Sequence, residues 1–242
     1  MSSKTGLACI ILDLMNTIMY GEDRFGPEQD YLATYRAMGG RICDAHELNE
    51  IIAGLLQNLE ADYRDESRHT VKPAWWHLNR LLAREHPGIA EKTTERIALN
   101  LTFAWHETGY IDKDVAHALR RLSHSYSIVI LSNLWGAPFF CERIIRKLEL
   151  SECFQARLYS SEWQLKKPHT AFYGAALKKV GGEPANTIVV GDDWRLDIAP
   201  AKELGMESIW LDRGRNLDGS DQLVLQDLPA VADYLCAPPA HS

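Results

Sequence analysis

Side chains that can bind metals and anions follow the short apolar runs of this 242-residue chain. The runs IVILSN and TIVVGDD have the composition of strands buried on both faces, which is typical of parallel sheets covered by helices. Ligands bind at the carboxyl ends of parallel strands, near the point where the strand order reverses. The groups expected at that edge are the carboxylates of Asp13, Asp192, Asp193 and Asp197, the hydroxyl of Ser132, the amide of Asn133, and an amine of Lys166 or Lys167.

Carboxylates crowded at one edge of a sheet repel one another unless a positive charge lies among them. Mg²⁺ takes oxygen ligands and usually keeps several waters beside one or two carboxylates and a substrate phosphate. The residue types at this edge therefore favour a hard cation, or a cationic side chain, among the carboxylates.

The elements that would position these side chains alternate between strand and helix. Short apolar runs predict five strands, at residues 7–12, 126–131, 156–159, 187–190 and 207–211. Helical patterns lie between them, for example Val115, Leu119 and Leu122 at helical spacing and a helix that begins after Pro168. This order of strand and helix predicts an α/β fold with a doubly wound parallel sheet.

Residues 27–108 lack such runs, and their apolar residues recur at helical spacing instead. Examples are Trp75, Leu78 and Leu82, and Ile97, Leu101 and Ala104. Glycine and proline interrupt this pattern near residues 39, 73 and 87. We therefore expect an all-helical insertion of about four helices directly after the first strand. The predicted domains are an α/β core at residues 1–20 and 110–242 and a helical cap at residues 21–109.

Four short motifs stand at the ends of the predicted strands or in the loops beside them. They are DLMNT at residues 13–17, LSN at 131–133, KKP at 166–168 and GDDWRLD at 191–197. Together and in this order they resemble the motifs of the haloacid dehalogenase (HAD) superfamily. The resemblance implies a Rossmann-like core with a helical cap inserted after the first strand. It also implies a Mg²⁺-dependent hydrolase that acts on a small phosphorylated metabolite.

The resemblance implies a role for each matching residue. Asp13 matches the nucleophile, whose carboxylate attacks phosphorus to give an aspartyl-phosphate. Lys167 matches the lysine that neutralises the nucleophile and the phosphate. The residues matched to binding of the phosphoryl group are Thr17, Ser132 and Asn133. Those matched to Mg²⁺ are Asp13, the backbone carbonyl of Met15, Asp192, Asp197 and, as an additional ligand, Asp193.

Met15 is the point at which this chain departs from the phosphatases of the superfamily. They carry an aspartate two residues after the nucleophile, which protonates the leaving group and then activates water. Methionine carries no proton, and a positioned acid or base contributes about 10²–10⁴ in rate. Haloacid dehalogenases and phosphonatases also lack aspartate there, so non-phosphatase chemistry on Asp13 stays an alternative. A phosphonatase would need a cap lysine, such as Lys72 or Lys92, to form a Schiff base. A binding protein without turnover is the third alternative.

Some of the singled-out side chains also have plain structural explanations. Asp193 can cap the helix that it precedes, and Lys166 is expected to be a solvated surface charge. Aromatic clusters at residues 75–77 and 105–106 are expected in a helical core more often than in a pocket. A cap histidine or Glu107 is where a substitute proton donor would be sought.

Composition excludes several classes of function. The chain has 33 acidic and 26 basic side chains, a formal net charge of −7, and no basic cluster that would favour nucleic acid. Its first apolar run is interrupted by Asp13 and is too short for a signal segment or a membrane span. The five cysteines show neither metal-ligand spacing nor a disulfide framework, which is typical of a cytoplasmic protein. The identity of the substrate and the oligomeric state do not follow from the sequence.

Overall fold

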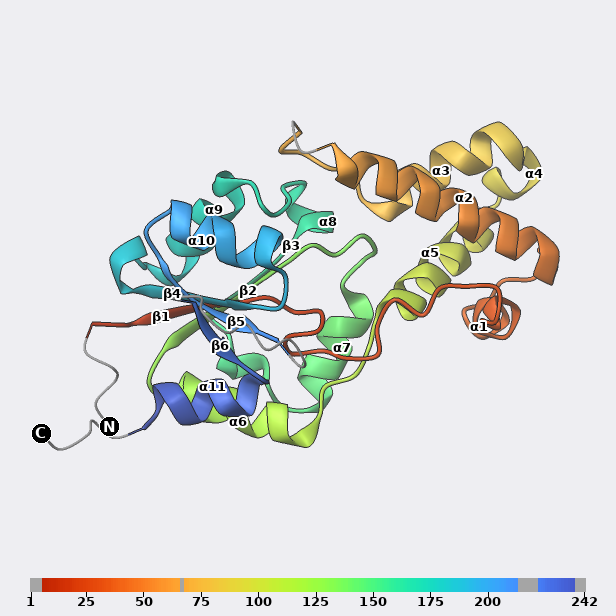
Figure 1. The fold of residues 1–242 in the computed structure, drawn as a ribbon. Helices are drawn as coiled ribbons and strands as arrows, with labels where there is room; N and C mark the ends of the chain where they lie inside the picture. The colour runs from red at the N-terminus through yellow and green to blue at the C-terminus, as the bar shows by residue number, and fades with distance from the viewer. Residues whose placement is uncertain (1–5, 66–67, 213–221, 238–242) are drawn as a thin grey trace, which may run out of the picture.

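The protein is built around one six-stranded parallel sheet (Figure 1). Its structure is a computed structural model that describes residues 6–65, 68–212 and 222–237. The strands are β1 (Cys9–Leu12), β2 (Ser127–Ser132), β3 (Ala156–Tyr159), β4 (Thr187–Gly191), β5 (Glu207–Leu211) and β6 (Leu223–Leu225), in the spatial order β3-β2-β1-β4-β5-β6. β1 pairs with both β2 and β4, and Leu12 lies beside Ile130 on one side and Val190 on the other. The strand order therefore reverses beside β1, which is where doubly wound sheets bind their ligands.

Helices cover both faces of this sheet, because the central strands are apolar on both sides. The core helices are α6 (Lys113–Ser123), α7 (Phe139–Lys147), α8 (Ser160–Trp163), α9 (Thr170–Val180), α10 (Ala199–Glu203) and α11 (Leu228–Leu235), with 3₁₀ turns η1 (Ser151–Cys153) and η2 (Pro184–Asn186). Ile10 and Leu12 of β1 belong to the hydrophobic cluster that includes α6, α7 and α11. Cys9 and Ile11 point to the opposite face, where α9 and α10 pack. The alternation of side chains along β1 thus places it in the middle of three layers.

The predicted parallel α/β sheet is confirmed, and each of the five predicted strands is present. Their ends differ from the predicted ends by at most two residues, the largest difference being at the start of β1. Strand β6 and helices α7 and α11 were not predicted from the sequence.

A second group of helices lies to one side of the sheet (Figure 1). These helices are α1 (Tyr31–Ala37), α2 (Ala45–Arg64), α3 (Ala74–Glu85), α4 (Pro87–Ala90) and α5 (Thr93–Glu107). They surround a hydrophobic cluster of their own, in which Tyr35, Leu48, Leu82 and Phe103 are buried. The described residues thus hold five helices where about four were expected, because α4 is a single extra turn. No helix in the parts of the chain that the structure describes is long and apolar enough to span a membrane.

Two buried faces of this group differ from the sequence prediction. Trp75 and Ile97, expected on the apolar faces of their helices, are 51% and 53% exposed. Leu78 and Leu82 of α3 and Ala104 of α5 are buried as predicted. Leu81 is buried in place of Trp75 and Phe103 in place of Ile97, so each apolar stripe is partly rotated from the predicted one. The expectation that the cap aromatics lie in a core is also wrong for Trp105, which is 41% exposed.

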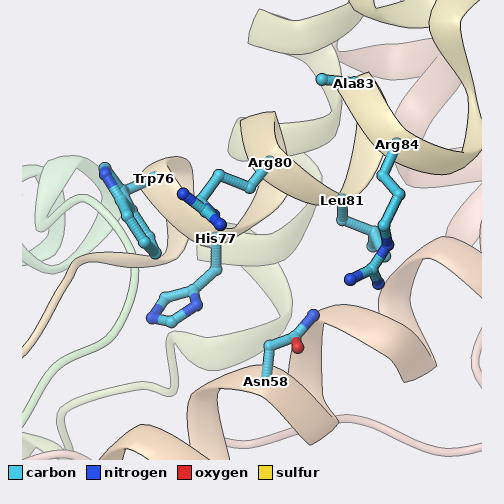
Figure 2. Close-up of a pocket in the computed structure, with 7 residues that line it drawn as sticks. All are labelled: Asn58, Trp76, His77, Arg80, Leu81, Ala83 and Arg84. Carbon is cyan, nitrogen blue, oxygen red and sulfur yellow. The ribbon is translucent and has the colours of Figure 1, made fainter.

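A broad hollow lies between α2 and α3, as Figure 2 shows. Trp76, His77, Arg80 and Arg84 of α3 line it, together with Asn58 of α2, and its volume is about 620 Å³. The Arg80 guanidinium lies over the Trp76 ring at 4.8 Å from the ring centroid. None of the residues expected at the carboxyl edge of the sheet lines this hollow, so its size does not make it the catalytic site.

The chain leaves the sheet for the helical group and returns at one point. Tyr20 and Tyr110 form an antiparallel bridge there, in which each amide donates to the other's carbonyl at 2.8 Å. We call residues 21–109, between these two tyrosines, the helical insertion. The division of the chain into domains at residues 20/21 and 109/110 stays a prediction.

Candidate active site

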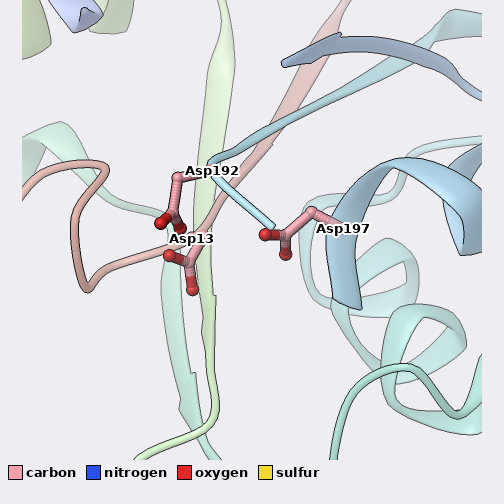
Figure 3. Close-up of side chains that lie close together, drawn as sticks. All are labelled: Asp13, Asp192 and Asp197. Atoms are coloured by element: carbon pink, nitrogen blue, oxygen red, sulfur yellow. The ribbon is translucent and has the colours of Figure 1, made fainter. Parts of the chain in front are cut away.

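Three carboxylates meet at the carboxyl edge of the sheet, beside the reversal of strand order (Figure 3). Asp13 directly follows β1, and its amide continues the strand ladder by donating to the Val190 carbonyl at 3.0 Å. Asp192 directly follows β4, and Asp197 lies in the π-helical turn η3 (Trp194–Ile198). One carboxylate oxygen of each aspartate lies within 4.8 Å of those of the other two. The structure thus brings together three of the four aspartates that the sequence places at this edge.

Lys167 lies between two of these carboxylates. Its Nζ donates to Oδ1 of Asp13 at 2.5 Å and to Oδ1 of Asp197 at 2.7 Å, and all three side chains are buried. Burial alone would lower the pKa of this amine, but the charges of Asp13 and Asp197 raise it above its usual value. Lys167 therefore remains an ammonium and supplies one positive charge to the group.

Asp192 and Asp197 resist ionisation. Burial raises the pKa of both Asp192 and Asp197, and the charge of Asp13 raises each further, while Lys167 opposes the shift. Three carboxylates around one ammonium carry an excess of negative charge. A hard divalent cation would compensate for this excess, and clustered carboxylate oxygens are the donors that Mg²⁺ takes. The residues present therefore fit a magnesium ion.

Two hydroxyl groups and an amide lie beside the nucleophile. Thr17 donates from Oγ1 to Oδ2 of Asp13 at 3.2 Å. The Oγ of Ser132 is buried without a hydrogen-bond partner among the described residues, a state that costs about 1–3 kcal/mol and that a ligand oxygen would relieve. Asn133 is engaged elsewhere, because its amide group accepts from the Lys167 amide at 2.8 Å and donates to the Lys167 carbonyl at 3.1 Å. Asn133 thus fixes the backbone that carries Lys167.

The turn after Asp13 contains one residue with a left-handed backbone, Asn16. Asn16 has a φ of 54°, in the left-handed region that asparagine adopts more readily than most residues. Met15 lines the cavity beside Lys167, so the side chain two residues after Asp13 is apolar and faces that cavity. That the Met15 carbonyl binds a metal stays a prediction.

A cavity of about 240 Å³ lies beside Lys167, between the sheet edge and the helical insertion, and its described lining residues do not include the three aspartates themselves. Met15, Asn133, Lys166, Lys167, Pro168, Arg195 and Leu196 line it from the core, Trp135 from the loop after β2, and Asp23, Tyr63 and Glu107 from the insertion. The insertion thus contributes two carboxyl groups and a phenol to the space in which a substrate would lie.

The sequence as a whole matches a known enzyme family. The model of the haloacid dehalogenase-like hydrolases matches residues 7–205. The chain belongs to this family. Among curated relatives, the glyceraldehyde 3-phosphate phosphatase of Methanocaldococcus jannaschii is 39% identical over 80 residues, and that of Pyrococcus furiosus is 38% identical over 97 residues. These matches span 33% and 40% of this chain, and only 35% and 40% of the length of those relatives.

Solved structures of the HAD fold cover nearly the whole chain. The 2-haloacid dehalogenase from Pseudomonas syringae pv. Tomato DC3000 has a TM-score of 0.66 at 19% identity and covers 95% of this chain and 98% of its own. A HAD phosphatase from Thermococcus onnurineus has a TM-score of 0.53 at 15% identity and covers 95% and 98%. At such identities the likeness establishes a fold that dehalogenases and phosphatases share.

The structure decides the role of Asp193, for which the sequence left two alternatives, and corrects the expectation for Lys166. The Asp193 carboxylate accepts from the amides of Arg195 and Leu196 at 2.7 and 2.9 Å, so it caps η3 and lies outside the carboxylate group. Lys166 is not a surface charge, because only 2% of it is exposed.

The Lys166 ammonium binds the end of a helix of the insertion. Its Nζ donates to the carbonyls of Asp62, Tyr63 and Asp65 at 3.0, 2.9 and 2.8 Å. The last carbonyls of a helix lack intrahelical partners and carry partial negative charge, so a cation is stabilised there. Lys166 thus joins the core of the HAD hydrolase to the C-terminal end of α2.

The sequence offered a cap histidine or Glu107 as a substitute proton donor, and Lys72 or Lys92 as a Schiff-base lysine. Glu107 does line the cavity. His106 does not, since its Nδ1 donates to the Arg24 carbonyl at 2.9 Å and its Nε2 lies 3.0 Å from Oγ1 of Thr34, within the insertion. Lys72 donates to Gln164, and neither it nor Lys92 lines the cavity.

Asp23, Tyr63, Trp135 and Arg195 line the cavity and were not singled out from the sequence. Only Arg195 could have been found, because it lies within the motif GDDWRLD that carries Asp192 and Asp197.

Proposed function

We propose that this HAD hydrolase is a Mg²⁺-dependent phosphatase of small phosphorylated metabolites, with Asp13 as its nucleophile. The observation that supports this most directly is the carboxylate group of Asp13, Asp192 and Asp197 beside one buried lysine. Opening a carbon–halogen bond does not require so much negative charge around one point. A phosphate ester is itself an anion, and it can approach these carboxylates only when a cation lies among them.

Asp13 is oriented for attack on phosphorus by its two neighbours. Lys167 holds Oδ1 and Thr17 holds Oδ2, so the carboxylate cannot rotate freely. A carboxylate oxygen forms a bond to phosphorus, and the bond from phosphorus to the ester oxygen breaks. The product is an aspartyl-phosphate, which water then hydrolyses. Lys167 keeps its charge throughout, which offsets the negative charge that gathers on the phosphoryl oxygens.

The remaining side chains fit supporting roles. Asp13, Asp192 and the backbone carbonyl of Met15 would hold Mg²⁺, which when bound neutralises charge on the phosphoryl group. Asp197 would complete the acidic set while it positions Lys167. The unpartnered hydroxyl of Ser132 would donate to a phosphoryl oxygen. Asn133 would act through the Lys167 loop that it holds.

The cavity and the sequence relatives point to a small substrate. A volume of about 240 Å³ equals about eight water volumes, enough for a phosphate with a chain of a few carbon atoms. Both named relatives are glyceraldehyde 3-phosphate phosphatases. We therefore propose that the substrate of this chain is also a short phosphorylated metabolite.

A second candidate is favoured by Met15. A halide leaves without a proton, so a dehalogenating site loses nothing when residue 15 cannot supply one. Chloride release from 2-chloropropionate without added metal would support dehalogenation and contradict the phosphatase proposal.

Phosphate release tests the proposed function. The wild-type protein should release phosphate from glyceraldehyde 3-phosphate or 4-nitrophenyl phosphate when Mg²⁺ is present, and chelation of the metal should stop the release. Asp13→Ala should abolish it. Asp114→Asn removes an exposed carboxylate on α6 and should leave the rate unchanged. Phosphate release by Asp13→Ala at the wild-type rate would exclude Asp13 as the nucleophile.

A further inference from the structure

Met15 leaves the proposed reaction without a proton donor for the ester oxygen, so the cavity lining must supply one if alkyl phosphates are to react. Among the described residues, six lining side chains carry titratable or charged groups: Asp23, Tyr63, Glu107, Lys166, Lys167 and Arg195.

Four of the six are unsuited to exchange a proton with a substrate. Lys167 is held as an ammonium by two carboxylates, and Lys166 Nζ donates three hydrogen bonds to backbone carbonyls. The guanidinium of Arg195 does not release a proton in proteins. The Tyr63 hydroxyl is 2.6 Å from Oγ of Ser160, and burial raises its pKa above the usual value.

Glu107 is committed to the backbone of the loop after β2. Its Oε1 accepts from the Trp135 amide at 2.7 Å, and its Oε2 accepts from the Gly136 amide at 2.8 Å. A Cβ on Gly136 would lie 2.7 Å from Oε2, so the loop packs tightly on this carboxyl group. Burial, and to a lesser degree the nearby charge of Asp23, raises the pKa of Glu107 to about 8. Glu107 is thus a positioning residue, because each of its two oxygens holds a backbone amide of this loop.

Asp23 has a free carboxyl group in the same cavity. The carboxyl oxygens make no ion pair or hydrogen bond with the described residues. Burial raises the pKa of Asp23, while the cavity leaves its side chain open to water and ligand. A carboxyl group whose pKa is raised and that faces a ligand space is suited to acid and base catalysis.

The backbone of Asp23 is held in a conformation that most residues avoid. Its φ is 50°, in the left-handed region. The Asp23 amide donates to the Glu107 carbonyl at 3.3 Å, and the Arg24 amide donates to the His106 carbonyl at 2.8 Å. Arg24 Nη2 also donates to the carbonyls of Trp105 and Thr108. The end of α5 therefore fixes the segment that aims Asp23 at the cavity, and unusual backbone held in this way is common at functional sites.

We infer that Asp23 is the proton carrier of the reaction, supplied by the helical insertion in place of the aspartate that Met15 replaces. The inference rests on the proposed phosphatase function. As the bond from phosphorus to the ester oxygen breaks, its electron pair stays on that oxygen, which takes the proton of the Asp23 carboxyl and leaves as an alcohol. In the second half, water attacks the phosphorus of the aspartyl-phosphate, and its proton returns to the Asp23 carboxylate as the bond to Asp13 breaks.

Leaving-group dependence tests this role. Asp23→Asn should slow the release of phosphate from glyceraldehyde 3-phosphate, an alkyl ester, by about 10²–10⁴-fold. It should change the first turnover of 4-nitrophenyl phosphate far less, because 4-nitrophenolate leaves without a proton. Met15→Asp added to Asp23→Asn should restore much of the alkyl activity, since a carboxyl group again faces the ester oxygen.

Control variants separate this role from loss of structure. Asparagine and glycine both adopt a left-handed backbone at low cost, so Asp23→Asn and Asp23→Gly should keep the wild-type melting temperature. Glu28→Gln removes an exposed carboxylate of the same segment and should keep the wild-type rate on both esters.

Equal rates of wild type and Asp23→Asn on the alkyl ester, or equal losses on both esters, would overturn the role of Asp23 and leave the phosphatase proposal standing. A wild-type protein that releases no phosphate from either ester would instead overturn the phosphatase proposal, and this inference with it.

Discussion

Replacement of Lys167 by methionine gives the sharpest test of the charge balance at the site. The variant keeps the length of the side chain and removes the ammonium that lies between Asp13 and Asp197. Breaking a buried ion pair by removing one partner costs about 3–5 kcal/mol, because the other charge stays buried without compensation. Two charges at most 4.8 Å apart, the limit within which these carboxylate oxygens lie, repel by at least about 3.5 kcal/mol at an effective dielectric constant of about 20. Lys167→Met should therefore lower the free energy of unfolding by about 3–5 kcal/mol in the absence of Mg²⁺.

This destabilisation should depend on pH and on Mg²⁺, whereas a destabilisation caused by poorer packing would not. Without the ammonium, the carboxyl groups hold protons in the folded state that they release in the unfolded state. Their contribution to stability is present at low pH and is lost as pH rises, so the deficit should be smaller at pH 6 than at pH 8. Mg²⁺ should recover part of it, because it supplies positive charge to the same carboxylates.

Urea unfolding at both pH values, with and without Mg²⁺, would measure the loss in the free energy of unfolding of Lys167→Met. Lys166→Met is the matched control, since Lys166 is equally buried but binds backbone carbonyls, and Mg²⁺ should not reduce its deficit. A deficit for Lys167→Met that is the same at both pH values and in both metal conditions would refute the electrostatic reasoning.

Three further predictions concern the metal, a buried carboxyl group and the insertion. Asp192→Asn should weaken Mg²⁺ binding measured by calorimetry, and no measurable binding to wild type, with or without phosphate, would remove the metal from the mechanism. Glu107 has a pKa of about 8 in the fold and about 4.3 when unfolded, so it adds stability that is present at low pH and lost as pH rises through this range. Glu107→Gln should flatten that slope in unfolding measurements, and an unchanged slope would contradict it. A chain with residues 22–108 replaced by a short linker should fold and bind Mg²⁺, because Tyr20 and Tyr110 already pair side by side. It should lose substrate selectivity, since the insertion lines the cavity. Failure to fold would show that the two hydrophobic clusters depend on each other.

The sheet and the residues at its edge could be foreseen because their signals are local. Strands such as β2 and β4 are short apolar runs with polar residues directly after them, and the order of strands along the chain sets the edge at which those residues meet. That Lys167 lies beside Asp13 could be predicted from its place directly before Pro168 in the motif KKP. Strand β6, with three residues, is too short to show a periodic pattern.

The details that were missed depend on contacts between distant segments. The environment of Lys166 is set by carbonyls more than 100 residues earlier in the chain, and nothing near Lys166 in the sequence reveals them. Asp23 faces the cavity only because its segment pairs with the end of α5. The rotation of α3, which exposes Trp75, is decided by what the helix packs against.

The pair of lysines before Pro168 links two parts of the molecule through a single peptide unit. Lys166 binds the end of α2, and Lys167 binds the nucleophile. A displacement of α2 away from the sheet has to break three hydrogen bonds to Lys166, and the resulting pull acts on the next residue. The position of the ammonium that orients Asp13 therefore depends on the contact between α2 and the core. One dipeptide thus makes the charge at the nucleophile sensitive to where the helical insertion lies.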